Sequence, residues 1–137
     1  MDIISHVKWK GNIKSGEGEL TTGTGLFKNK PYYLIEKKGA ANLIPEELLS
    51  AAFSSCFNMT LMVLLDCDVY KVYHLNTTCN IDINDRGIIK GHLIIEAKVD
   101  HIAIDRFYVL VQKAKEQSPI ARILTFPFTT TVVLNQG

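Results

Sequence analysis

The first forty residues alternate between apolar and polar positions in short runs. Segment 5–11 alternates in this way, segment 16–25 carries four glycines at turn positions, and segment 30–39 is rich in β-branched and aromatic residues around Tyr32–Ile35. A period of two is typical of strands with one buried face, and glycine marks the turns between them. This part of the chain is therefore predicted to form β-strands.

A long apolar segment begins at Pro45 and continues for about twenty residues, the length of an ordinary helix. Proline is tolerated at the first helical position, and Glu46 and Glu47 follow where carboxylates interact favourably with the positive helix end. Apolar residues cover most of the circumference: Leu48, Leu49, Ala52, Phe53, Cys56, Phe57, Met59, Val63 and Leu64. Such a helix must be covered on nearly all sides, so a partner subunit is expected to supply part of the cover.

The remaining segments predict two paired strands, a second helix and a last strand. Segment 72–84 is apolar at alternate positions, a turn is predicted at residues 84–87, and segment 87–100 returns as the paired strand. An amphipathic helix begins near Asp105 and ends at Ser118-Pro119, a short extra turn covers 119–124, and the final strand covers 128–136. The order β-β-β-α-β-β-α-β indicates an α+β fold with antiparallel sheets.

Length and composition narrow the classes of protein that remain. The 137 residues suit one domain spanning 1–137, and 15 basic residues against 14 acidic ones give no electrostatic case for nucleic acid or an anionic membrane. The N-terminus lacks the pattern of a secretory signal. The uncharged run Leu48–Leu65 is long enough to span a membrane, but five polar residues interrupt it, so no span is expected. Three cysteines make no disulfide framework, which favours reduced thiols in the cytoplasm.

No motif for a metal or a cofactor is present in the sequence. There is no CxxC, the four histidines lack metal-site spacing, and neither a dinucleotide-binding motif nor a P-loop occurs. The chemistry that remains is that of the cysteines. Taken alone, Cys56 and Cys79 read most simply as core residues, and Cys67 as a partly exposed thiol or a helix-end residue. Cys56 and Cys67 would lie about 16 Å apart on one straight helix, too far for a disulfide.

Several motifs occur in one order along nearly the whole chain. They are Trp9–Lys14 followed by Gly16-Glu17-Gly18, then Gly25-Leu26, Pro31-Tyr32, Pro45–Phe57, Asn76-Thr77-Thr78 and Gln112–Pro119. Together they resemble the OsmC branch of the OsmC/Ohr hydroperoxide reductases, and the PEELLSAAFSSCF block is the most specific part. The resemblance implies an intertwined homodimer whose β-sheets wrap around long central helices. It also implies thiol-dependent reduction of organic hydroperoxides and, more weakly, of hydrogen peroxide.

The resemblance assigns roles to individual residues. It implies that Cys56 is the peroxidatic cysteine and Glu46 the active-site carboxylate. The position of the family's arginine falls at Lys37, or at Lys38 if a one-residue gap is placed differently. A cysteine in mid-helix gains little from the helix dipole, so a neighbouring cation is needed to stabilise the thiolate. Lysine is a flexible point charge and arginine a planar fork, so weaker activation and looser positioning are expected.

Helix geometry bears on where such a site would lie. Glu46 and Cys56 are ten residues apart, which is about 15 Å along one straight helix. Unless the helix bends sharply, Glu46 of one subunit is therefore expected to meet Cys56 of the other. Phe53, Phe57 and Met59 near Cys56 form either an apolar pocket for the organic part of a hydroperoxide or ordinary core.

Ser118 is the main departure from the family pattern, because the resemblance places the second, resolving cysteine there. Three interpretations stay open: a natural one-cysteine enzyme reduced by an external thiol, an engineered Cys→Ser form, or a chain that kept the fold and lost the activity. Cys79 or Cys67 as a substitute resolver is poorly placed. The predicted function is a thiol-dependent hydroperoxide reductase. The alternative is a non-catalytic protein that binds a small apolar ligand at the dimer interface.

Overall fold

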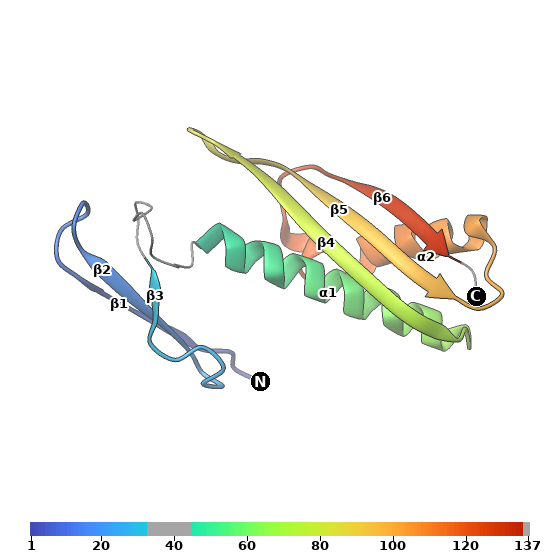
Figure 1. Ribbon diagram of the computed structural model, residues 1–137, viewed down its shortest axis with the longest axis horizontal. Coiled ribbons are helices and arrows are strands. Elements are labelled where there is room, and N and C mark those ends of the chain that lie inside the picture. The colour runs from blue at the N-terminus through green and yellow to red at the C-terminus, as the bar shows by residue number, and fades with distance from the viewer. Residues whose placement is uncertain (33–44, 136–137) are drawn as a thin grey trace. The chain divides into compact units, whose positions relative to one another are not determined.

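The computed structural model describes residues 1–32 and 45–135 (Figure 1). The elements in chain order are β1 (Ser5–Lys10), β2 (Glu17–Thr22), β3 (Lys30–Tyr32), α1 (Pro45–Cys67), β4 (Val72–Asn84), β5 (Gly87–Val99), α2 (Ile104–Gln117), the 3₁₀ turn η1 (Ala121–Ile123) and β6 (Phe128–Asn135). This order confirms the predicted α+β class. The chain divides into two compact units, Met1–Leu48 and Leu49–Gly137, which are described one at a time.

The first unit contains an antiparallel sheet in the order β1-β2-β3. Gly18 on the middle strand pairs with Trp9 on one side and Tyr32 on the other. The centroids of the two aromatic rings lie 5.7 Å apart, and a Cβ on Gly18 would overlap the Tyr32 ring. Glycine is therefore required at this position, because any side chain would displace the aromatic pair.

The second unit contains a three-stranded sheet in the order β4-β5-β6. β4 and β5 are antiparallel and joined at residues 85–86, as the sequence predicts. β6, however, pairs with β5 in parallel, so the expectation of purely antiparallel sheets is wrong for this pair. The reason is topological: α2 carries the chain back along the sheet, and a strand that follows a helical crossover runs in the direction of the strand before it.

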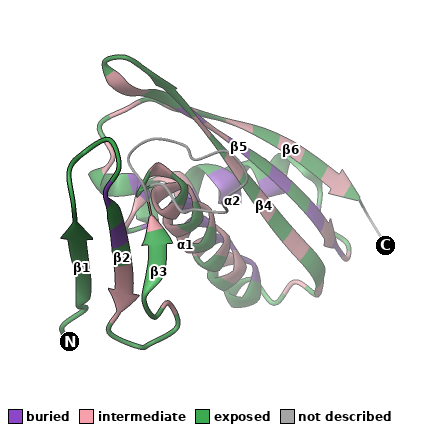
Figure 2. Ribbon diagram, turned by 60° about the vertical axis from the view of Figure 1, so that its left-hand side comes forward, coloured by how far each residue is buried: buried purple, intermediate pink, exposed green. Residues whose placement is uncertain are grey.

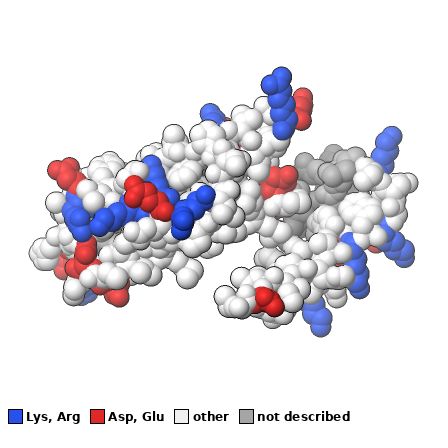
Figure 3. All heavy atoms as spheres, turned by 180° about the vertical axis from the view of Figure 1, so that it is seen from behind, with Lys and Arg blue, Asp and Glu red and all other residues white. Residues whose placement is uncertain are grey.

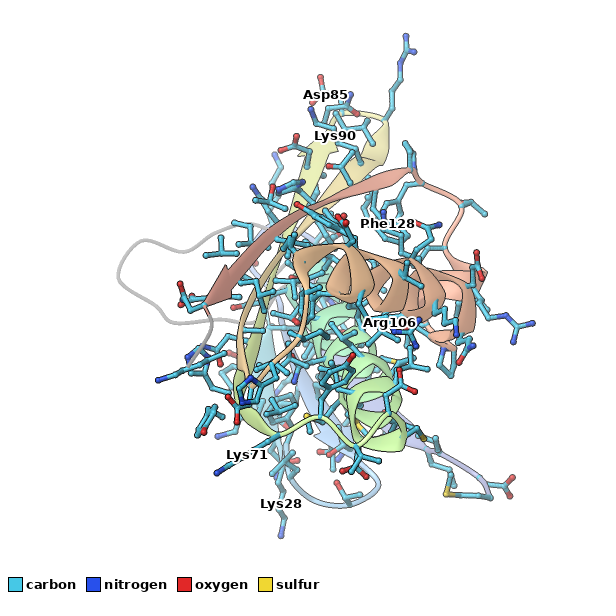
Figure 4. All side chains as sticks on the ribbon, turned by 90° about the vertical axis from the view of Figure 1, so that its right-hand side faces the viewer. Lys28, Lys71, Asp85, Lys90, Arg106 and Phe128 are labelled. Atoms are coloured by element: carbon cyan, nitrogen blue, oxygen red, sulfur yellow. The ribbon has the colours of Figure 1, made fainter. Side chains whose placement is uncertain are left out.

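Both helices contribute to one core on one face of this sheet (Figures 2 and 4). The sheet supplies alternate residues of β5, and each helix supplies a stripe at helical spacing. The fully or almost fully buried side chains are Leu93, Ile95, Ala97 and Val99 on β5; Phe53, Phe57, Leu61 and Leu65 on α1; and Phe107, Leu110, Val111 and Ala114 on α2. The predicted strand over segment 87–100 is therefore confirmed, and its alternate residues 93, 95, 97 and 99 are buried.

The other sides of α1 are less well covered. Met59 is 68% exposed and Val63 60% exposed, although both are apolar. Several hydroxyl groups on α1 donate to carbonyls one turn earlier, for example Ser54 to Ser50 and Thr60 to Cys56, so they need no outside partner. By length and composition α1 could cross a membrane, a test that a core helix of a soluble protein also passes.

Figure 3 shows one face of the molecule. On the part of it that residues 49–135 form, positive and negative side chains are interspersed. Lys90 and Asp82, which face each other across β4 and β5, approach to 3.5 Å. Both side chains are more than half exposed, and exposed pairs of this kind contribute little to stability.

α1 ends in a cap that is unusual in its residue type. The Val69 N–H donates to the Asp66 carbonyl at 2.9 Å, and the Tyr70 N–H donates to the Leu65 carbonyl at 3.1 Å. These two bonds define a Schellman cap, in which glycine is the usual residue at the left-handed position. Here Val69 occupies that position with φ +62°, and its side chain is 88% exposed. A β-branched residue in this conformation is strained, and its exposed side chain gains nothing from packing.

We therefore predict that Val69→Gly stabilises the protein. The free energy of unfolding should rise by about 1 kcal/mol, because glycine removes the left-handed strain at a moderate entropic cost. Urea unfolding at one fixed protein concentration measures this change. Val69→Ala is the control, since it keeps the Cβ and should recover much less. A Val69→Gly variant no more stable than Val69→Ala would contradict the account.

Candidate functional site

Cys56 and Ser118 meet at the junction of the two helices. Cys56 lies in the middle of α1, and Ser118 is the residue that caps the C-terminus of α2. The Ser118 Oγ donates a hydrogen bond to the Cys56 Sγ at 3.4 Å. Ser118 is fully buried and Cys56 is partly exposed. The two positions that the sequence resemblance singles out, 62 residues apart in the chain, are thus in direct contact.

The backbone of Ser118 is held from both sides. Its N–H donates to the Ala114 carbonyl at 2.8 Å, and its carbonyl accepts from the Arg122 N–H at 3.0 Å. Among residues 1–32 and 45–135, the Cys56 Sγ is the only hydrogen-bonding partner of the hydroxyl. A buried hydroxyl without a partner costs about 1–3 kcal/mol, so the contact with sulfur is favoured.

A second contact fixes the other end of the same helix pair. The Arg106 guanidinium, in the first turn of α2, lies 2.5 Å from the Asp68 carboxylate just beyond α1, and this pairing raises the pKa of Arg106. Twelve residues separate Asp68 from Cys56, and twelve separate Arg106 from Ser118. The two helices therefore run antiparallel and are joined at both ends of an overlap of about 18 Å. Figure 4 shows Arg106 on α2 beside α1.

Aromatic packing holds the turn of α1 that carries Cys56. The Phe53 ring lies edge-on to the Phe128 ring, with 5.0 Å between the ring centroids. It also lies edge-on to the Phe126 ring, with 6.4 Å between the centroids. Phe53 and Phe57 are fully buried, so for these two the interpretation as ordinary core is confirmed. Met59 lies instead on the exposed side of α1. The sulfur is therefore fixed on a rigid, packed helix.

The other two cysteines lie elsewhere in the fold. Cys67 is exposed at the end of α1, eleven residues from Cys56. Cys79 lies on β4, where burial raises the pKa of its thiol and its carbonyl accepts a hydrogen bond from the Ser50 hydroxyl. Ser50 points about 120° away from Cys56 around the α1 axis. β4 thus covers a different side of α1 from the one that carries the Cys56–Ser118 contact.

The remaining predicted site residues are only partly described. Glu46 lies in the first turn of α1, which runs without interruption to Cys67. Ten residues of helix between Glu46 and Cys56 correspond to about 15 Å of rise, so the two do not meet within one helix. Lys37 and Lys38 lie outside the described residues. In the described part of the chain, no group of His, Cys, Asp or Glu could hold a metal ion.

A shallow pocket of about 340 Å³ lies between α1 and β4. Five of its six lining residues have polar side chains: Ser54, Ser55, Asn58, Asn76 and Thr77, with Leu75 as the sixth. The Thr77 hydroxyl donates to the Asn58 side-chain oxygen at 2.8 Å across it. Cys56 is not part of this lining.

The sequence is similar to known proteins along most of its length. The family described as OsmC-like protein matches residues 38–133. Peroxiredoxin OsmC of Escherichia coli and that of Shigella flexneri are each 32% identical over 126 residues, which is 88% of this chain and 88% of theirs. The chain belongs to the OsmC-like family.

Solved structures extend this likeness to the fold. An OsmC-like protein of unknown function from Vibrio cholerae gives a TM-score of 0.76 at 16% identity, covering 97% of this chain and 99% of its own. An organic hydroperoxide resistance protein from Elizabethkingia anophelis gives 0.70 at 19% identity, covering 96% of each chain. The OsmC-like fold is therefore shown.

The contact between Cys56 and Ser118 predicts that Ser118→Cys creates a disulfide on mild oxidation. An S–S bond of about 2.05 Å requires the two atoms to approach by roughly 1 Å from their present 3.4 Å separation. Counting free thiols under denaturing conditions should show the loss of two of the four that this variant contains. The same substitution in a Cys56→Ser background should lose none. Full retention of all four thiols after oxidation would contradict the contact.

Proposed function

We propose that this protein is a thiol-dependent peroxidase that reduces organic hydroperoxides, and hydrogen peroxide more weakly, with Cys56 as the reacting group. Two relatives carry the name peroxiredoxin, and one similar structure is that of an organic hydroperoxide resistance protein. The observation that carries the proposal is the hydrogen bond from the Ser118 Oγ to the partly exposed Cys56 Sγ. A donor aimed at a sulfur stabilises negative charge on it, and the thiolate is the nucleophile.

The proposed reaction begins with attack by the Cys56 thiolate on one oxygen of ROOH. The O–O bond breaks, the S–O bond forms, and RO⁻ leaves as the alcohol after taking up a proton. Cys56 is thereby oxidised to the sulfenic acid, and the hydroperoxide is reduced by two electrons.

An external thiol completes the cycle in this proposal, since a serine at position 118 cannot form a disulfide. One thiol attacks the sulfenic sulfur and releases water, which leaves a mixed disulfide. A second thiol attacks that disulfide, restores Cys56 and leaves as the oxidised pair. Among the interpretations of Ser118, we favour the natural one-cysteine enzyme acting in a reducing compartment such as the cytoplasm.

We further propose that the active unit is a homodimer. The exposed apolar residues Met59 and Val63 on α1 support this, because they lack cover within the described chain. In the dimer, Glu46 of one subunit would lie near Cys56 of the other. Lys37, or Lys38, would supply the cation that the carboxylate orients.

The first test is turnover. With dithiothreitol as reductant, the protein should consume cumene hydroperoxide, and dimedone should label Cys56. Cys56→Ser should abolish consumption because it removes the nucleophile, and Cys79→Ser should leave most of it because Cys79 lies on a different element. Unchanged peroxide together with unlabelled Cys56 would remove the enzyme assignment and leave the ligand-binding alternative.

The second test asks which subunit supplies the carboxylate. Cys56→Ser and Glu46→Gln chains should each be nearly inactive as homodimers. When the two are refolded together, a mixed dimer contains one intact Cys56 and the unmodified Glu46 of its partner. Random pairing should restore about a quarter of the unmodified activity. If Glu46 instead serves its own subunit, every site in the mixed dimer lacks one group and no activity returns.

A further inference from the structure

We propose that Ser118 is a positioning residue whose hydroxyl holds the Cys56 sulfur as a thiolate and orients it toward the exposed side of α1. This inference rests on the proposed function, because it concerns the reacting sulfur. It gives Ser118 a role of its own as a hydrogen-bond donor, in addition to the absence of the family's second cysteine at this position.

The position of the donor is fixed by the fold. Ser118 follows α2 directly. Its backbone N–H donates a hydrogen bond to the Ala114 carbonyl, and its carbonyl accepts one from the Arg122 N–H. Its side chain is fully buried, and in the part of the chain that the structure describes it bonds to the Cys56 Sγ alone. A hydroxyl held in this way cannot turn to water, so its proton is available to the sulfur.

The bond has a direction that depends on the charge of the sulfur. A thiolate carries only acceptor lone pairs, so the Ser118 O–H must donate to it. A neutral thiol makes at best a weak bond with the same hydroxyl. Hydrogen bonds to charged groups are roughly twice as strong as neutral ones. The contact therefore favours the anion over the thiol.

The geometry also separates two sides of the sulfur. Ser118 is fully buried and contacts the sulfur from the end of α2, whereas Cys56 as a residue is partly exposed. Both the hydroperoxide and the external thiol would have to approach from a side that Ser118 does not occupy. Ser118 neither gives up nor receives electrons in either step.

The experiment measures Cys56 reactivity without peroxide. In a Cys67→Ser, Cys79→Ser background, we expect Ser118→Ala to slow alkylation of Cys56 by iodoacetamide about tenfold at neutral pH. The ultraviolet absorbance of the thiolate should fall with it. If Ser118 served only to pack the helix end, a folded Ser118→Ala variant would keep the thiolate absorbance of the unmodified protein.

Matched variants separate the hydroxyl from the shape of the side chain. Ser118→Thr retains the donor and should keep the rate within about threefold, whereas Ser118→Val has nearly the same shape as threonine and should be as slow as alanine. Ser54→Ala is the control for removing a hydroxyl from the same region, because the Ser54 hydroxyl bonds to carbonyls of α1. It should leave both readouts unchanged.

The possible results separate this inference from the proposed function. If the valine and alanine variants fold and alkylate as fast as the threonine variant, the positioning role is wrong, and peroxidase turnover would still stand. If alkylation slows as expected but no variant, including the unmodified protein, consumes peroxide, the positioning role holds and the peroxidase proposal fails. If neither the valine nor the alanine variant folds while threonine does, the unmodified side chain at position 118 is tested in the same two-serine background. A thiolate absorbance at neutral pH no greater in the folded protein than in the urea-unfolded protein would overturn the hydroxyl's role.

Discussion

The antiparallel pairing of α1 and α2 is the constraint on which the candidate site depends. The helices are joined near one end by Arg106 and Asp68 and at the other by Ser118 and Cys56. Between these contacts, the buried stripe of α2 and that of α1 enter the same core against β5. Neither contact could form if one helix shifted by a turn, since a turn is about 5.4 Å.

This constraint gives a mid-helix cysteine a hydrogen-bonding partner from another element. The dipole of α1 acts at the ends of the helix, and Cys56 is far from both. The end of a second helix brings a hydroxyl within 3.4 Å of the sulfur. Aromatic packing of Phe53 on Phe128 holds the turn of α1 just before Cys56 against β6.

Much of the architecture could be predicted from local patterns. The predicted strands 72–84 and 87–100 correspond to β4 and β5, and α2 ends just before Ser118-Pro119 as expected. The parallel pairing of β6 could not be predicted in this way, because the alternation of a strand does not encode the direction of its neighbour. Val69 was also missed, since the left-handed cap falls on a residue type that ordinarily avoids it.

The candidate site was predictable to a different degree at each residue. Cys56 and Ser118 were singled out by family resemblance, and their contact then followed from tertiary packing that spacing alone does not reveal. The Arg106–Asp68 pair had no sequence signal, because 38 residues separate its members. The proposed role of Glu46 requires a second subunit, and one chain's sequence does not specify which copy of a residue would complete a site.

The most direct test of the account is the mass of the Cys56 peptide after one equivalent of cumene hydroperoxide, with no thiol present. The account predicts the gain of one oxygen at Cys56, removed again by added thiol, while Cys67 and Cys79 stay unmodified. A Cys56 peptide of unchanged mass after peroxide has been added would contradict the central claim that this sulfur is held as a reactive anion.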